Sequence, residues 1–252
     1  LPNGPWHIQI LEIDLSDTMN TLETVKAGDA IAGYERTSSM ANRMDFEGHT
    51  VVGAINGDFY ASGGISIGAQ IIKGTLLKRP YPRSVFAMSV DKVPYIGIVS
   101  YNGQVSKHDS LSLTIHGINE VRNENQVILY NRFSGSTTGT NQWGVELELQ
   151  YLDHPVGVNQ TVVAIVTAKD SILETGHGNM TIPQTLGGVL SGHGTSRDYI
   201  NEHYFVGDTL LINLNLPPAT SVLSELIGGT PRIIRNGARS VEWEAESVSS
   251  SF

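Results

Sequence analysis

The sequence contains no cysteine, which excludes disulfide bonds, thiolate nucleophiles and thiolate-bound zinc. Positive charge is scarce, because 16 Lys and Arg stand against 25 Asp and Glu and give a formal net charge of −9. A chain of this charge repels polyanions, so we do not expect a nucleic-acid partner. A membrane-spanning helix needs about 18 or more consecutive apolar residues, and no apolar run in the sequence is nearly that long, so we expect no membrane span.

What the sequence does contain is enough apolar residues for a sizeable core, since 40% of its 252 residues are hydrophobic. Short runs of alternating or continuous apolar residues predict strands, and they outnumber the helix signals. We therefore expect an α+β, β-rich fold with mixed or antiparallel sheets and few short helices. The predicted strands cover 6–15, 51–55, 70–72, 85–90, 95–100, 112–115, 126–130, 145–150, 161–168, 209–216 and 231–235, and the predicted helices cover 37–44, 196–202 and 221–226.

Polar side chains are most concentrated just after the predicted strand 51–55. Residues 54–60 read AINGDFY, so an apolar strand ends in the amide of Asn56 and the carboxylate of Asp58, and glycines follow at 63 and 64. Polar groups at the end of a strand often line functional sites, because the sheet holds them rigidly. The structural alternative is a β-turn in which Asn56 and Asp58 bond their own backbone while Phe59 fills the core. Both interpretations are open at this stage.

A second glycine-rich segment, 227–237, reads IGGTPRIIRNG. Gly228 and Gly229 leave backbone free of side chains next to Arg232, whose planar guanidinium can bind two oxygens of a phosphate or carboxylate. The segment is not a P-loop, because it lacks the Gly-Lys pattern and a strand follows where a helix is required. The structural alternative is a surface hairpin, turned by Asn236 and Gly237, with solvated arginines.

Together these segments resemble the phosphodiester glycosidase domain family, the family of the uncovering enzyme. The resemblance rests on residues 38–41, 54–60, 68–74 and 227–237, which follow one another in the order in which the family's motifs occur. It implies an α/β fold with a mixed sheet and the removal of N-acetylglucosamine from a phosphodiester. Because many bacterial relatives are exported, it also implies a secreted or cell-surface protein.

The resemblance also implies a domain organisation. Residues 1–90 would form the N-terminal part of the family's domain, 91–216 a β-rich inserted portion without family motifs, and 217–252 a return to the first domain. The family's Leu-Asp-Gly-Gly-Gly-Ser signature does not occur in the sequence. We therefore expect residues 1–252 to be the N-terminal portion of such a domain.

Cleavage of a glycosyl phosphodiester requires a cation or acid at the leaving phosphate and a carboxylate near the oxocarbenium-like transition state. On the resemblance, Asp58 is the candidate catalytic residue. The candidate substrate-binding residues are Asn56, Lys73, Gly228, Gly229 and Arg232, with Lys73 and Arg232 neutralising phosphate. The substrate would be a sugar-1-phosphodiester or another carbohydrate. No cofactor is implied, and a metal requirement and the oligomeric state stay open.

A different class of function is a non-catalytic, β-rich module that binds cell-wall glycan. Exposed aromatic rings stack on the faces of sugars, although most aromatic residues in strands belong to the core. The candidates for stacking are Trp6, Tyr130, Trp143, Tyr151 and Tyr199. A third possibility is a purely structural piece of a larger surface protein.

Overall fold

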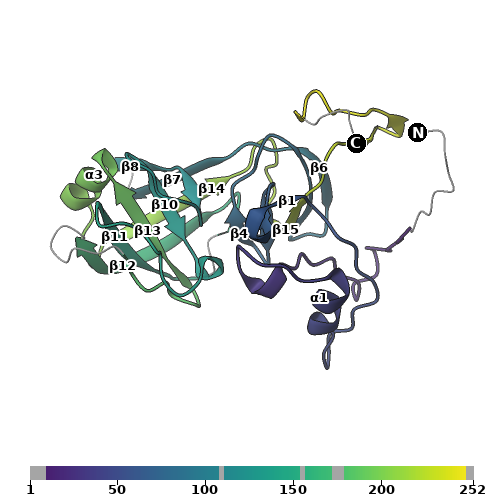
Figure 1. Cartoon of the computed structure of the whole chain (residues 1–252), viewed down its shortest axis with the longest axis horizontal. Coiled ribbons are helices and arrows are strands. Elements are labelled where there is room, and N and C mark those ends of the chain that lie inside the picture. The colour runs from purple at the N-terminus through teal and green to yellow at the C-terminus, as the bar shows by residue number, and fades with distance from the viewer. Residues whose placement is uncertain (1–9, 108–110, 154–156, 172–178, 248–252) are drawn as a thin grey trace.

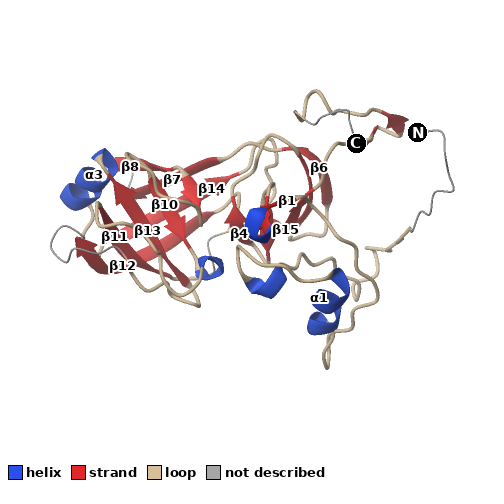
Figure 2. Cartoon of the chain, in the orientation of Figure 1, coloured by secondary structure: helices blue, strands red, loops and turns tan. Residues whose placement is uncertain are grey.

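The computed structural model describes residues 10–107, 111–153, 157–171 and 179–247. Strands dominate this part of the chain, and its helices are few and short (Figure 2). The strands pair antiparallel except β9 with β10, which run parallel. The expected α+β, β-rich class with mixed or antiparallel sheets is therefore confirmed. Helix α1 (Thr37–Met44) and helix α3 (Thr195–His203) match two of the three predicted helices.

One sheet has five antiparallel strands in the order β4-β3-β15-β5-β6. Its strands are β3 (Gln70–Ile72), β4 (Thr75–Lys78), β5 (Ser84–Ser89), β6 (Pro94–Ile98) and β15 (Leu223–Gly228). Strand β15 lies between β3 and β5, where Ile227 is paired with both Gln70 and Phe86. Segments more than 120 residues apart in the sequence are thus neighbours in this sheet.

The other large sheet has eight strands in the order β8-β7-β14-β12-β11-β13-β10-β9. It forms the end of the molecule that carries α3, beside the five-stranded sheet (Figure 1). Its strands are β7 (Asn102–Lys107), β8 (Leu111–Ile115), β9 (Gly117–Ile118), β10 (Val127–Tyr130), β11 (Gly144–Tyr151), β12 (Thr161–Ser171), β13 (Gly187–His193) and β14 (Thr209–Asn215). The sheet is nearly closed into a barrel, because His116 joins edge strands β8 and β9 directly and donates its backbone N–H to Val127 O at 2.7 Å.

The chain passes from the five-stranded sheet to the eight-stranded sheet between Ile98, the last residue of β6, and Asn102, the first residue of β7. Strand β6 falls inside the range 91–216 that we expected to be an inserted portion, but it pairs with β5 in the five-stranded sheet. The contiguous stretch that builds the eight-stranded sheet is therefore 102–215.

Two small hairpins complete the regular structure. Strands β1 (Tyr60–Ala61) and β2 (Ile65–Ser66) enclose the 3₁₀ turn Ser62–Gly64. Strands β16 (Ile234–Arg235) and β17 (Ala238–Arg239) are joined by Asn236 and Gly237, whose positive φ angles of 51° and 76° suit the predicted Asn-Gly hairpin turn. Further 3₁₀ turns cover Ala27–Asp29 and Arg132–Ser134.

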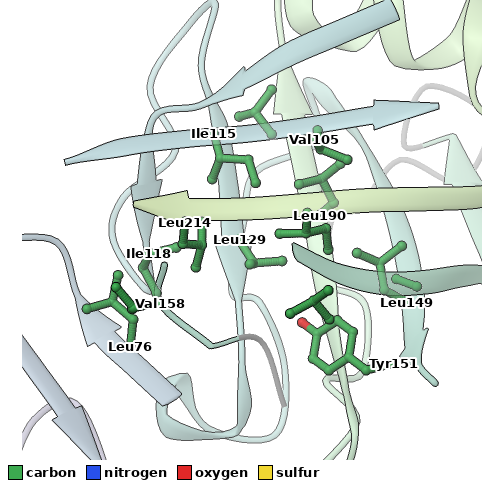
Figure 3. Close-up of a cluster of buried hydrophobic side chains, with 14 of the residues drawn as sticks. Leu76, Val105, Ile115, Ile118, Leu129, Leu149, Tyr151, Val158, Leu190 and Leu214 are labelled. Atoms are coloured by element: carbon green, nitrogen blue, oxygen red, sulfur yellow. The ribbon is translucent and has the colours of Figure 1, made fainter. Parts of the chain in front are cut away.

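The two large sheets share one hydrophobic core. Leu76 of the five-stranded sheet belongs to the same buried cluster as Val105, Ile115, Leu129 and Leu190 of the eight-stranded sheet (Figure 3). Removal of this apolar surface from water stabilises both sheets together. The five-stranded sheet, which positions the candidate site, is therefore supported by the barrel-like sheet.

Several predicted elements are wrong. Residues 221–226 enter strand β15 instead of a helix, because β3 and β5 offer hydrogen bonds on both sides and bury Leu223 and Leu226. Residues 51–55 and 10–15 form no strand, and residues 6–9 of the first predicted strand lie outside the described residues. No helix of the described residues is long and apolar enough to cross a membrane.

Candidate functional site

Asp58 lies in the turn that leads into strand β1, in a left-handed backbone conformation with φ of 55°. Its Oδ1 accepts the N–H of Phe59 at 2.7 Å, and its Oδ2 accepts the N–H of Gly68 at 2.8 Å. The carboxylate therefore closes the base of the β1–β2 hairpin. Asp58 does bond backbone as the turn interpretation expected, but Phe59 is 45% exposed and does not fill the core.

The two glycine-rich segments of the sequence meet at this carboxylate. A Cβ on Gly228 of β15 would lie 2.7 Å from Asp58 Cγ and 2.8 Å from both carboxylate oxygens. A Cβ on Gly57 would lie 2.6 Å from Ile227 Cδ1, and one on Gly68 would lie 3.1 Å from Asp58 Oδ2. Side chains at these glycines would hold the turn away from the sheet, so glycine is what permits the close approach.

The charge environment of Asp58 combines burial with surrounding cations. Burial raises the pKa of the Asp58 carboxyl above its ordinary value, while the N–H donors of Gly68 and Phe59 and the charges of Lys78 and Arg83 act in the opposite direction. A carboxyl with a raised pKa holds its proton nearer to neutral pH, which suits a general acid. Perturbed groups of this kind are candidates for functional sites.

Two lysines bind the backbone of the same hairpin. Lys78 Nζ donates to Ser66 O at 2.5 Å, and Lys26 Nζ donates to Gly64 O at 2.5 Å. Burial lowers the pKa of both ammonium groups, while the charge of Asp58 opposes this effect. Arg83 adds a third cation, and its Nε is buried with no hydrogen-bond partner among the described residues. Carbonyl partners do not neutralise these charges, so the cluster can attract an anion.

The sequence analysis did not single out Lys26, Lys78 or Arg83. Lys78 ends a strand of buried residues, which is an unusual place for a charge, but no spacing links it to Lys26 or to Asp58. The cluster depends on how the hairpin packs, so a local sequence signal for it does not exist.

The structure does not bring Lys73 to Asp58. Lys73 lies in the turn between β3 and β4, and its Nζ is 3.6 Å from Glu23 Oε2. Gly68, which binds Asp58, precedes the other end of β3, and five residues of extended chain span about 16 Å. The backbone N–H of Lys73 donates to the buried carboxylate of Glu225 at 3.0 Å.

The side chain of Arg232 also binds groups away from Asp58. Its Nη2 is 2.7 Å from Glu242 Oε2, and its Nη1 donates to Ile96 O at 3.2 Å. Strand β6, which carries Ile96, lies two strands from β15, about 10 Å away. The backbone N–H of Gly229 donates to Ser84 O, and Asn56 is exposed with no hydrogen-bond partner among the described residues. Of the predicted site residues, the structure therefore brings together Asp58 and Gly228, and Asn56 precedes Asp58 by two residues in the chain.

The aromatic residues expected to stack on sugar fall into different groups. Tyr130 and Tyr151 are buried, with 4% and 3% exposure, so their expected role in stacking is wrong. Tyr199 packs against His203 and Tyr204, Trp143 is 52% exposed, and Trp6 lies outside the described residues.

An aromatic pair that the sequence analysis missed lies on the β1–β2 hairpin instead. Tyr34 and Tyr60 are 69% and 65% exposed, with ring centroids 5.6 Å apart in an edge-to-face arrangement. The hydroxyl of Tyr34 accepts the N–H of Gly63 at 3.0 Å, which fixes this ring against the hairpin. Because Tyr60 follows Asp58 by two residues, the pair lies near the charged cluster.

Asp58 is half-buried, and it does not line a separate cavity of the structure. That cavity, of about 210 Å³, has Glu23, Lys92 and Glu225 in its lining. Within the described residues, no three His, Asp or Glu side chains are grouped closely enough to hold a metal ion.

Comparison with known proteins gives a fold and no function. No family model matches the chain, and no curated protein matches it. A solved structure of a hypothetical protein from Synechocystis is similar with a TM-score of 0.52 and 20% identity, over 78% of this chain and 35% of that one. A presumed exported protein from Burkholderia pseudomallei is similar with a TM-score of 0.57 and 15% identity, over 90% of this chain and 49% of that one. The chain thus spans half or less of the length of these structures.

Proposed function

We propose that this chain carries the Asp58-centred part of a phosphodiester glycosidase-like hydrolase, which acts on a sugar-1-phosphodiester or a related cell-envelope glycan. The observation that carries the proposal is the Asp58 carboxyl, which is desolvated against Gly228 and surrounded by the charges of Lys26, Lys78 and Arg83. This is the pairing that the reaction requires, a carboxyl group next to cations that can accept a phosphate.

In this proposal the roles assigned to cations change. Lys78 and Arg83 take the phosphate-neutralising role that the sequence suggested for Lys73 and Arg232, because their charges act on Asp58. Asp58 either protonates the leaving oxygen or stabilises the oxocarbenium-like sugar. Asn56, exposed two residues before it, orients substrate hydroxyls, and Gly228 leaves the space in which the carboxyl lies.

We also propose that the protein is secreted or displayed at the cell surface. The family resemblance supports export, and the Burkholderia protein of similar fold is described as a presumed exported protein. Cell-envelope glycans are substrates that an exported hydrolase meets.

Asp58→Asn is the variant that tests the enzymatic proposal. In the natural full-length protein we expect turnover of a sugar-1-phosphodiester to fall by about 10²- to 10⁴-fold, because asparagine can neither donate a proton nor carry the negative charge. The measurement is release of free sugar under saturating substrate, with thermal unfolding recorded in parallel. Asp91→Asn, at an exposed aspartate, is the matched control and should keep full turnover. Unchanged turnover in Asp58→Asn would remove Asp58 from the mechanism.

The exposed Tyr34–Tyr60 pair favours a second candidate, a glycan-binding module without catalysis. Exposed aromatic rings offer apolar faces to pyranose rings. If this is the function, Tyr60→Ala should abolish saturation-transfer NMR signals from a cell-wall oligosaccharide, while the unaltered protein shows no turnover. Trp143→Ala alters an exposed ring in the turn just before β11 of the eight-stranded sheet and serves as the control. Loss of signal only in Trp143→Ala would place glycan binding on the barrel-like sheet instead.

A further inference from the structure

Residues 51–57 form a largely apolar segment in which no other part of the described chain covers the side chains of Val52 and Ile55. Val52 is 84% exposed and Ile55 is 78% exposed. In an extended segment, these two positions point to opposite faces. Apolar side chains exposed on both faces are typical of a strand that is buried between two layers.

The backbone of this segment is also without partners. The N–H of Val51 is 3.4 Å from Asp45 Oδ1, and within the described residues no other hydrogen bond involves the backbone of 51–57. Buried or strand-forming backbone groups in folded proteins are almost always paired, and an open row of them is a template for another strand. The segment therefore combines exposed apolar side chains with free hydrogen-bonding groups.

The molecule nevertheless holds the segment in place at two points. Gly57 packs closely on Ile227 of β15, and Gly53 approaches the side chain of Leu11. Asp58, directly after the segment, is bonded to Gly68. Because its end is anchored, the segment presents its backbone in a defined position instead of as a free tail.

We propose that residues 51–57 are a strand that pairs with strands from polypeptide of the same protein that lies outside residues 1–252. The lengths of the similar structures support this occupant, since more than half of each lies outside its match to this chain. A polypeptide that pairs with 51–57 also covers Val52 and Ile55 and lies next to Asp58, which directly follows the segment. The proposal depends on the segment's packing and on these lengths, and it does not rest on the proposed chemistry.

The first measurement is the intact mass of the natural polypeptide, followed by hydrogen exchange of the natural protein and of residues 1–252 alone. We expect a mass well above 27.2 kDa. We also expect amides 52–57 to exchange at close to free-peptide rates in residues 1–252 and at least about 100-fold more slowly in the natural protein. A mass of 27.2 kDa, or equal exchange in both proteins, would overturn the proposal.

Two further outcomes identify other occupants and would also overturn it. Slow exchange of 52–57 in a monomer of residues 1–252 would assign the pairing to residues already present. Slow exchange that appears only when residues 1–252 dimerise in sedimentation would assign it to a second copy.

Matched aspartate substitutions check the same inference through stability. Val52→Asp should lower the melting temperature of the natural protein by about 5 °C or more, because it places a charge where strands cover the segment, but it should leave residues 1–252 unchanged. Val121→Asp is the control, because Val121 is 77% exposed and lies in another loop. It should leave both proteins unchanged, and equal effects of the two substitutions would count against the proposal. None of these readouts depends on turnover, so failure of the Asp58 chemistry leaves them interpretable.

Discussion

Glu146→Ala is expected to destabilise the protein by about 3–5 kcal/mol, because it breaks a fully buried polar network. Glu146 lies in β11 with 0% exposure. Its Oε1 accepts the hydroxyls of Thr140 and Ser191, each at 2.8 Å. Its Oε2 accepts the hydroxyl of Thr138 at 3.0 Å and the N–H of Met180 at 2.8 Å. One carboxylate thus ties two loops to the barrel-like sheet.

The substitution also leaves a buried cation without its countercharge. Arg122 is 5% exposed, and its Nη1 donates to Ser191 Oγ at 2.6 Å. Burial lowers the pKa of Arg122, and the charge of Glu146 opposes this effect. Removing only the carboxylate therefore adds an unpaired buried charge to the lost hydrogen bonds.

Urea unfolding followed by circular dichroism measures the effect. Glu148→Ala is the matched control, since Glu148 lies two residues further along β11 and is partly exposed. Among the described residues, its side chain accepts one hydrogen bond, from the hydroxyl of Thr167. It should cost no more than about 1 kcal/mol. Equal free energies of unfolding for the two variants would mean that Glu146 does not anchor the loops.

Gly228→Ala is expected to damage the candidate site directly and to cost about 1–3 kcal/mol of stability. The new methyl group would lie 2.7 Å from Asp58 Cγ, where the carboxyl group cannot remain. Gly228 is paired with Val85 of β5, and Ile227 just before it is paired on both sides, so the strand is held in place and Asp58 must move away from the N–H of Gly68. If Asp58 is catalytic, turnover falls together with stability.

Gly229→Ala provides a close control for this substitution. A Cβ on Gly229 meets no atom within 4 Å, and the residue is next to Gly228 in the chain. We expect it to leave the melting temperature of the natural protein nearly unchanged. Equal behaviour of the two alanine variants would contradict the packing of Asp58 on Gly228.

The candidate site was only partly predictable from the sequence. Asp58 and Gly228 belong to local patterns, a polar strand end and a glycine pair, so each was found. Their contact links positions 170 residues apart in the chain, and only the pairing of β15 between β3 and β5 produces it. Lys73 and Arg232 were assigned to phosphate by residue type, but Glu23 and Glu242 hold their side chains.

The sequence by itself determined the β-rich class, the Asn-Gly hairpin at 236–237 and helix α1, because turn chemistry and apolar periodicity are local properties. Tertiary structure decided which segments became strands. Residues 221–226 were drawn into a sheet by partners on both sides, whereas the strongly apolar 51–55 found no partner in the described chain. It also decided the charge of the site, since Lys26 and Lys78 meet on one hairpin through its packing. Hydrogen bonds and desolvation depend on neighbours that are distant in sequence, and a local pattern does not contain them.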